Sequence, residues 1–485
     1  MTSALAPGLL LAALRSGAGK TTLALGMMRA LTRQGLCVAP VKCGPDYIDP
    51  AFHGAATGRA SVNLDAWAMD ESLLSHLAGR AAERADLVIA EGAMGLFDGA
   101  PALDFASGAA ADIARLTRWP VMLILDVSGQ GQSAAVLARG ALLHDPGVSI
   151  AGVVLNRVAS ERHRKLCCDA IEAVGVRVFG ALPRVKALSL PERHLGLVQA
   201  AETDGLAARL DGLADFVETH VDLEAVLACA GGGVAAQATR EFEARPPGQR
   251  IAVARDAAFS FHYPHLLQAW SDAGAELFFF SPLADEPPPD ACDFCWLAGG
   301  YPELHAGRIA AAQTFREGLR DFARARPVHG ECGGYMVLGD GLVDADGARH
   351  AMAGLLRLET SFSQRKLTLG YRRGSLARAH PLGVEGAILY GHEFHYAVTL
   401  CENGSAFASV RDAYTQDARP CGLHEGTVSG SFFHLLATKK GPPTRQRPES
   451  REETPKEGIE ARTSRCDALL IMLRRTNVKL KLDAN

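Results

Sequence analysis

The stretch Ser16-Gly17-Ala18-Gly19-Lys20-Thr21-Thr22 lies between two apolar runs, residues 8–14 and 23–28. This order predicts a buried strand, a glycine turn and a helix. A glycine-rich turn lets several backbone N–H groups point inward, and the N-terminus of the following helix adds a partial positive charge. We therefore expect these seven residues to bind ATP, with Lys20 at the outer phosphates and the Thr21 hydroxyl on magnesium. The usual motif has Gly where Leu14 stands, so a turn without a nucleotide is the alternative, and the flanking strand and helix disfavour it.

Bulk properties limit the classes of protein that this chain could represent. Its 485 residues are too many for one ordinary core, so two or three domains are expected. The net charge of −4 argues against a nucleic-acid partner, which would favour a basic excess. The 11 cysteines lack regular spacing, which is typical of reduced thiols in a cytoplasmic protein. No apolar run reaches the roughly 18 residues that span a bilayer, so we expect no membrane partner.

Acidic side chains follow two further apolar runs, residues 35–42 and 85–90. The first run leads into Asp46, Tyr47 and Asp49, and the second into Glu91 and Asp98. Open α/β sheets bind ligands at the carboxyl ends of their strands. An acid at a strand end opposite a phosphate loop holds magnesium or its water. The alternative for the first loop, that Asp and Pro only shape a turn, stays open.

The remaining pattern of the first half alternates strands with helices. Strands are predicted over residues 121–126 and 150–156, and helices over 109–117 and 132–143. This alternation predicts a parallel sheet with both faces covered. Asn156 ends a strand on the side of the phosphate loop, where it could contact adenine or only bond the strand end; both interpretations stay open.

A glycine-rich stretch divides the chain. We expect an ATP-dependent domain over residues 1–230, a linker over 231–248, a second α/β domain over 249–438, and a disordered tail over 439–485. Within the second domain, strands are predicted over residues 250–254, 275–281 and 293–298.

The second centre of chemistry is Cys332, which stands between small residues after a strand and before a helix. That context predicts a nucleophile elbow, and the helix N-terminus is expected to lower the thiol pKa. His434 is the candidate base, although a histidine in an apolar segment is often a core residue. Gly299 and Gly300 could supply an oxyanion hole.

Two other groups resemble metal motifs. Cys292 and Cys295 lack a second cysteine pair at zinc spacing, so we interpret them as core residues. His392, Glu393 and His395 would alternate between the two faces of a strand, which favours a substrate-facing strand over a single metal site.

Taken together, these motifs resemble the cobyrinic acid a,c-diamide synthase family, also called hydrogenobyrinic acid a,c-diamide synthase, from about residue 8 to residue 436. The resemblance rests on the phosphate loop together with KCGPDYIDP (42–50), EGAMGLFDG (91–99), LAGGYPE (297–303), GECGGYM (330–336), GHEFHY (391–396) and SFFHL (431–435).

The resemblance implies an N-terminal P-loop domain similar to dethiobiotin synthetase and a C-terminal class I glutamine amidotransferase domain. It implies amidation of the a and c carboxylates of a small-molecule corrinoid with glutamine, ATP and Mg²⁺, and it leaves a homodimer open. Cys332 and His434 match the catalytic pair. Thr21, Asp46 and Glu91 match metal positions, and Asp46, Tyr47, Asp49 and Asp98 match substrate or activation positions.

This sequence departs from related amidotransferases at one position, and two other functions compete with this interpretation. Many related amidotransferases place Glu two residues after the histidine, where this chain has Leu436, so the residue that orients His434 is open. The first rival is cobyric acid synthase, which amidates other corrin side chains. The second is a partitioning-type ATPase that binds partners or DNA.

Overall fold

Residues 8–13 form β1, the middle strand of a seven-stranded sheet in the computed structural model. The strand order is β3-β2-β4-β1-β5-β6-β7, and every pair is parallel. The strands are β1 (Gly8–Ala13), β2 (Val38–Cys43), β3 (Val62–Leu64), β4 (Leu87–Glu91), β5 (Val121–Asp126), β6 (Ile150–Val158) and β7 (Val178–Pro183). The structure describes residues 6–185, 192–193, 196–233, 245–415 and 417–439, which belong to one compact unit.

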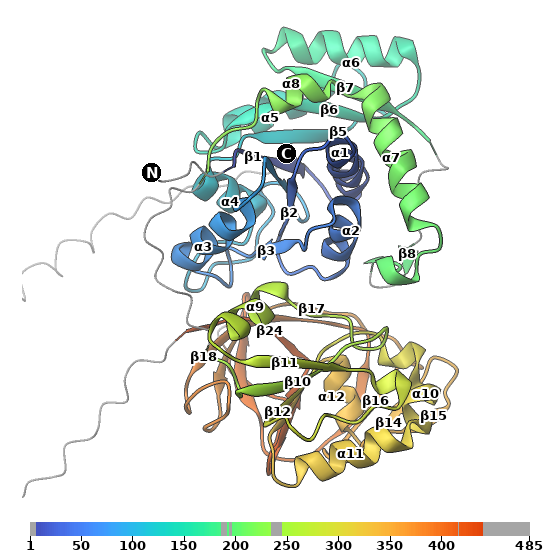
Figure 1. Cartoon of the computed structure of the whole chain (residues 1–485). Coiled ribbons are helices and arrows are strands. Elements are labelled where there is room, and N and C mark those ends of the chain that lie inside the picture. Colours follow the sequence, from blue (N-terminus) through green and yellow to red (C-terminus); the bar gives the residue numbers. More distant parts are fainter. Residues whose placement is uncertain (1–5, 186–191, 194–195, 234–244, 416, 440–485) are drawn as a thin grey trace, which may run out of the picture. The chain divides into compact units, whose positions relative to one another are not determined.

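Helices cover both faces of this sheet (Figure 1). Alternate residues of β1 enter different cores: Leu9 and Leu11 join one, and Leu10 and Ala12 the other. The first core includes helices α1, α2 and α7, and the second includes α3, α4, α5 and α6. The helices are α1 (Lys20–Arg33), α2 (Ile48–Thr57), α3 (Glu71–Ala82), α4 (Ala110–Thr117), α5 (Ala134–His144), α6 (Glu161–Ala173), α7 (Leu206–His220) and α8 (Leu223–Leu227). Because both faces are buried, the strands are mostly apolar, and polar side chains such as Lys42 and Glu91 stand at their carboxyl ends.

The second half contains another, mostly parallel sheet in the order β11-β10-β12-β13-β23-β22, with only β22 antiparallel to its neighbour. Its strands are β10 (Arg250–Ala254), β11 (Glu276–Phe280), β12 (Phe294–Leu297), β13 (Val328–Glu331), β22 (Leu423–Glu425) and β23 (Val428–Ser431). The helices of this half are α9 (Pro264–Asp272), α10 (Ala306–Ala311), α11 (Gln313–Ala323) and α12 (Gly333–Leu338).

Two smaller sheets complete this half. One has the order β15-β14-β16-β19, and the other, antiparallel, has the order β21-β20-β17-β18-β24. Their strands are β14 (Gly341–Val343), β15 (Arg349–Ala351), β16 (Leu358–Ser361), β17 (Thr368–Leu376), β18 (Ile388–His395), β19 (Val398–Glu402), β20 (Ala408–Asp412), β21 (Arg419–Cys421) and β24 (Phe433–Lys439). Residues 192–193 and 196–197 form a separate short pair, β8 and β9.

The predicted strands agree closely with the observed ones, and those over 121–126 and 250–254 have the same bounds as β5 and β10. β3 was not predicted, because three residues are too few for a period-two pattern to stand out. The domain limits stay predictions. Most of the expected linker (234–244) and nearly all of the expected tail (440–485) lie outside the described residues.

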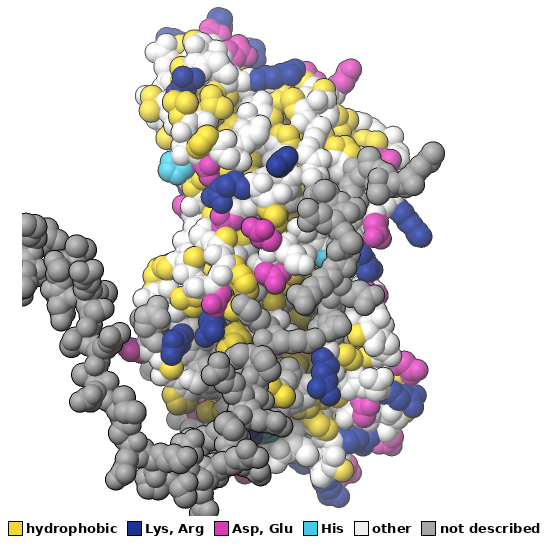
Figure 2. Space-filling view, turned by 90° about the vertical axis from the view of Figure 1, so that its left-hand side faces the viewer, with side chains coloured by type: hydrophobic (Ala, Val, Ile, Leu, Met, Phe, Trp, Pro, Cys, Tyr) yellow, Lys and Arg dark blue, Asp and Glu magenta, His cyan; other side chains and the backbone are white. Residues whose placement is uncertain are grey.

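Two further features of the structure are the charges on its surface and the hydropathy of its helices. On the face drawn in Figure 2, Lys and Arg side chains are interspersed with Asp and Glu side chains. Among the described residues, no helix combines the length and the hydropathy that crossing a membrane requires.

Candidate functional site

The phosphate loop connects β1 to α1 and depends on two glycines. Gly17 and Gly19 have φ angles of 71° and 95°, a region that favours glycine. A Cβ on Gly19 would lie 2.1 Å from Nδ2 of Asn156. That amide donates to the Ala18 carbonyl over 2.8 Å, so β6 supports the loop directly. The adenine contact predicted for Asn156 stays a prediction.

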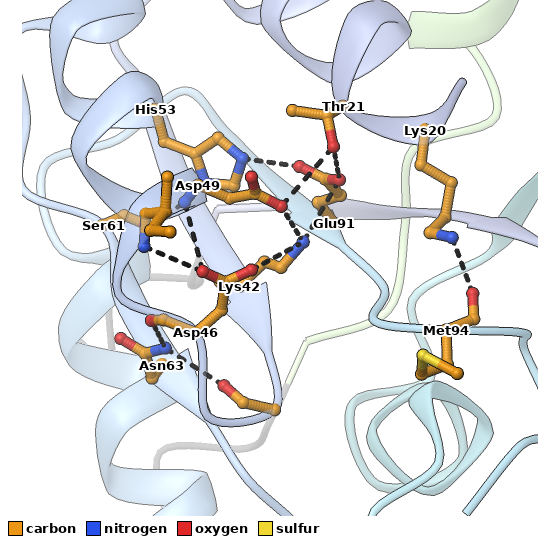
Figure 3. Close-up of polar contacts among 12 residues, drawn as sticks. Lys20, Thr21, Lys42, Asp46, Asp49, His53, Ser61, Asn63, Glu91 and Met94 are labelled. Carbon is orange, nitrogen blue, oxygen red and sulfur yellow. Dashed lines mark hydrogen bonds and ion pairs between the residues drawn. The ribbon is translucent and has the colours of Figure 1, made fainter. Parts of the chain in front are cut away.

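Lys20 begins α1 and is largely buried. Its Nζ donates to the carbonyl of Met94 over 2.6 Å, in the loop that follows β4 (Figure 3). Burial lowers the pKa of Lys20, and the nearby carboxylates, Glu91 first among them, oppose this shift. The side chain is therefore held over the edge of the sheet where the acidic loops begin.

Carboxylates from two strand ends meet the start of α1 in Figure 3. The Thr21 hydroxyl donates to Oε1 of Glu91 over 2.7 Å and lies 3.4 Å from Oδ2 of Asp49. Lys42 Nζ lies 2.5 Å from Oδ2 of Asp49, 3.2 Å from Oε1 of Glu91 and 3.7 Å from Oδ2 of Asp46. The adjacent positions of β1, β4 and β2 in the sheet bring these groups together.

The remaining predicted acids lie at the edge of this cluster. Asp46 accepts from the backbone N–H groups of Ile48 and Asp49 over 2.8 and 3.2 Å, and its Oδ2 lies 3.7 Å from Nζ of Lys42. Asp98 is exposed and accepts from the Gly95 N–H over 2.9 Å. The structure thus groups Thr21, Asp49 and Glu91, while Asp46 and Asp98 lie around them.

The sequence predicted no role for two residues of this cluster, Lys42 and His53. Lys42 is buried on β2, and its pKa is well above the usual value because three carboxylates outweigh the effect of burial. His53 lies four residues after Asp49 on α2, and its Nε2 is 2.7 Å from Oε2 of Glu91. The spacing of four could have indicated His53, because residues i and i+4 share a helix face.

The surroundings shift the pKa values of the two central carboxylates in opposite directions. Burial opposes ionisation of Glu91, but Lys42, His53 and Thr21 lower its pKa below the usual value. Burial and the neighbouring Asp46 raise the pKa of Asp49, while Lys42 acts to lower it.

The second site surrounds Cys332, between β13 and α12. Its φ of 45° is unusual for a non-glycine residue and matches the sharp strand-to-helix turn that was predicted. Burial raises the pKa of the thiol, the opposite of the sequence-based expectation; the Gly333 N–H acts to lower it but is outweighed. Burial thus favours the thiol form of Cys332 over the thiolate.

His434 lies on β24 and is fully buried. Burial lowers its pKa well below the usual value, so the ring is neutral and able to accept a proton. A Cβ built on Gly299 would lie 2.5 Å from His434 Cε1 and 3.4 Å from Cys332 Cβ. Gly299 therefore lies against both proposed catalytic side chains, and the oxyanion hole predicted for Gly299 and Gly300 stays a prediction.

Comparisons with known proteins match both halves. Residues 9–198 match the CobQ/CobB/MinD/ParA nucleotide binding domain, and residues 250–442 match the CobB/CobQ-like glutamine amidotransferase domain. The chain is 59% identical over 432 residues to a hydrogenobyrinate a,c-diamide synthase of Rhodobacter capsulatus, covering 89% of this chain and 98% of that protein. It is 55% identical over 439 residues to the enzyme of that name from Mesorhizobium japonicum, covering 89% and 99%.

The chain belongs to the hydrogenobyrinate a,c-diamide synthase family. This membership confirms the resemblance drawn from the motifs, and the two domain families confirm the fold class, a P-loop domain followed by a glutamine amidotransferase domain. The assigned site residues stay predictions.

In this member of the family, Tyr47 connects the two groups of residues. Its ring stacks on Phe261 at 5.0 Å between centroids and lies 4.2 Å from Tyr263 and 5.3 Å from His434. His392 stacks on His434 at 4.9 Å, and its Nε2 lies 2.7 Å from the Tyr263 hydroxyl. An aromatic cluster thus lies between the loop that carries Asp46 and the proposed base.

The two groups that resemble metal motifs have other neighbours in the structure. Cys292 and Cys295 are buried free thiols, and Cys295 lies in β12. His392 and Glu393 lie on β18, where Glu393 pairs with Arg372 at 2.8 Å. Within the described part of the chain, no group of three or more His, Cys, Asp or Glu side chains is arranged to hold a metal ion.

We expect Gly299→Ala to lower the kcat of glutamine-dependent amidation by about 10- to 100-fold, because the added methyl group displaces the His434 ring. Activity with ammonium should be unchanged, because ammonia bypasses this site. Steady-state assays with each nitrogen donor measure the difference. Gly307→Ala is the control, because its nearest neighbour to a new Cβ is 3.8 Å away. Equal loss with both donors would contradict a local effect.

Proposed function

We propose that this protein amidates the a and c side-chain carboxylates of hydrogenobyrinate, with glutamine as nitrogen donor and ATP as activating substrate. The support is the combination, within one chain, of a phosphate loop beside a carboxylate cluster and a buried Cys–His pair. The names of the relatives support hydrogenobyrinate as the corrinoid. Single-domain ATPases or glutaminases would carry only one of these groups.

The Cys–His pair releases ammonia from glutamine. Cys332 Sγ attacks the side-chain amide carbon while His434 takes the thiol proton, and the Gly299-Gly300 turn stabilises the oxyanion. His434 then returns the proton to the departing nitrogen, and ammonia leaves. Water hydrolyses the remaining thioester to glutamate and restores the thiol.

The phosphate loop activates the acceptor. A carboxylate has no good leaving group, so its oxygen attacks the γ-phosphorus of ATP, ADP leaves, and an acyl phosphate forms. Lys20 stabilises the charge on the transferred phosphoryl group. Ammonia then attacks the acyl carbon and expels phosphate, which gives the amide. Ammonia is largely protonated in neutral water, so a route shielded from solvent favours this step.

Magnesium fits the same cluster. Thr21, Glu91 and Asp49 supply the hard oxygen donors that Mg²⁺ prefers, and the low pKa of Glu91 keeps one of them charged. Asp46, assigned to the metal from its sequence motif, would act at the edge of this group beyond Lys42. When bound, the ion neutralises phosphate charge during transfer.

The acceptor carboxylate would enter a cavity of about 470 Å³. Asp46, Tyr47 and Asp98 line it from the first half of the chain, and Tyr371 and Phe394 from the second. Its largely apolar wall suits the edge of a macrocycle, and its acids lie beside the proposed magnesium site. A homodimer stays a prediction that sedimentation or light scattering would test.

Amidation with glutamine labelled with ¹⁵N at the amide tests this function. With ATP, Mg²⁺ and hydrogenobyrinate, we expect a product that carries two labelled nitrogens, counted by mass spectrometry. A parallel reaction with the cobalt-containing ring tests the choice of substrate form. Four labelled nitrogens would support the cobyric acid synthase rival, and ATP hydrolysis without any labelled product would support the partitioning-type ATPase.

A further inference from the structure

The proposed base His434 lacks an orienting partner on its own strand. Both ring nitrogens are buried, and neither has a hydrogen-bond partner among the described residues. Leu436, two residues along β24, is apolar and cannot accept from the ring. His392 lies flat against it, at 12° between planes, with its own Nε2 on Tyr263. The orienting group must therefore come from another element.

Glu331 is the carboxylate that the fold brings to this ring. It ends β13, directly before Cys332, and it is buried. Its Oε2 lies 4.0 Å from Nδ1 of His434, and its Oε1 accepts from the backbone N–H of Leu435 over 2.8 Å. Of the carboxylates in the described part of the chain, it is the one within 4.0 Å of His434. The hydrogen bond from the Leu435 N–H therefore holds the Glu331 side chain next to His434.

We infer that Glu331 is a positioning residue that orients His434 for proton exchange with Cys332. This inference rests on the roles proposed above for Cys332 and His434. One carboxylate oxygen anchors β24 through Leu435, and the other faces the ring. Catalytic hydrogen bonds are often long without substrate and tighten in the reacting complex, so 4.0 Å is within reach of a small ring movement.

A carboxylate at this place has a definite chemical effect. A negative oxygen facing Nδ1 favours the tautomer that carries its proton on Nδ1, which leaves Nε2 free to accept the thiol proton. The same charge stabilises the imidazolium that forms when Cys332 becomes a thiolate. A neutral side chain of equal shape would keep the packing and lose both effects.

Burial raises the pKa of Glu331 to about 8, and the Leu435 N–H acts in the opposite direction. A positive charge on the His434 ring favours the ionised form of this carboxyl. The carboxylate is therefore most stable when His434 carries the proton taken from Cys332.

Glu331→Gln separates this role from a structural one, because the Gln side-chain oxygen can still accept from Leu435. We expect the kcat of glutamine hydrolysis to fall by about 10- to 100-fold with the KM for glutamine within about 2-fold. Amidation with ammonium should be unchanged, and alkylation of Cys332 by iodoacetamide should slow. Glu331→Asp, which retains the charge, should recover part of kcat. An unchanged kcat, an effect on KM alone, or equal loss with ammonium would overturn the inference.

Two controls make the outcome specific. Glu359→Gln removes a half-buried carboxylate that pairs with Arg349 at 3.1 Å in the same half, and it should behave as the unmodified protein. Cys332→Ser tests the proposed function itself: if it retained glutamine hydrolysis, the function would fail. If it lost hydrolysis while Glu331→Gln kept it, only the inference would fail. Should Glu331→Gln not fold, Glu331→Asp must still show a lower kcat with unchanged ammonium activity.

Discussion

Replacement of Cys332 by serine is expected to lower glutamine-dependent amidation by about 10³-fold or more while ammonium-dependent amidation stays within about 2-fold. The serine hydroxyl is a much weaker acid than a thiol and a much weaker nucleophile than a thiolate, so the same base activates it far less. The phosphate loop and its carboxylates belong to another sheet, so activation of the acceptor does not need this thiol. Initial rates with glutamine and with ammonium chloride, at saturating ATP, give the two values.

The matched control is Cys401→Ser, which changes an exposed free thiol on β19 of the same half. Its rates should equal those of the unmodified protein with both nitrogen donors. Circular dichroism should show that both variants are folded. If Cys332→Ser also lost its ammonium-dependent activity while folded, the two reactions would not be separable, and the proposed division of labour between the halves would be wrong.

The elements that carry these residues could be predicted because their signals are local. The apolar run before Ser16 and the helix after it show the phosphate loop directly. Glu91 could be placed near the phosphate loop because parallel strands bring their carboxyl ends to one edge of the sheet. The structure confirms this placement, since Glu91 accepts a hydrogen bond from the Thr21 hydroxyl. The turn at Cys332 followed from small residues on both sides, and its positive φ agrees.

The contacts that were missed depend on register between distant segments. Lys42 joins Asp49 and Glu91 only because β2 and β4 are neighbours, and periodicity does not give the order of strands in a sheet. Glu331 and His434 are more than a hundred residues apart in the sequence, yet Oε2 of Glu331 lies 4.0 Å from Nδ1 of His434. The pKa of the Cys332 thiol also depends on burial, which a helix N-terminus alone does not reveal.

Replacement of Lys20 by methionine is expected to lower amidation by about 100- to 1000-fold with glutamine and ammonium alike. Methionine retains the apolar stem but removes the positive charge that stabilises the transferred phosphoryl group. It also removes the bond from Nζ to the Met94 carbonyl, which fixes the side chain over the edge of the sheet. Glutamine hydrolysis measured without ATP should be unchanged, because Cys332 and His434 lie in the other half. Amide product and glutamate are measured in the same reactions.

Lys165→Met is the matched control, because Lys165 is an exposed residue of α6 in the same half and pairs with Asp169 at 2.9 Å. This variant should keep the amidation and glutamine-hydrolysis rates of the unmodified protein. The pattern for Lys20→Met is the reverse of that for Cys332→Ser: loss with both nitrogen donors but intact hydrolysis, against loss with glutamine alone. If Lys20→Met kept its ammonium-dependent rate, the phosphate loop would not be the site of carboxylate activation, and the acidic cluster around Glu91 would need another role.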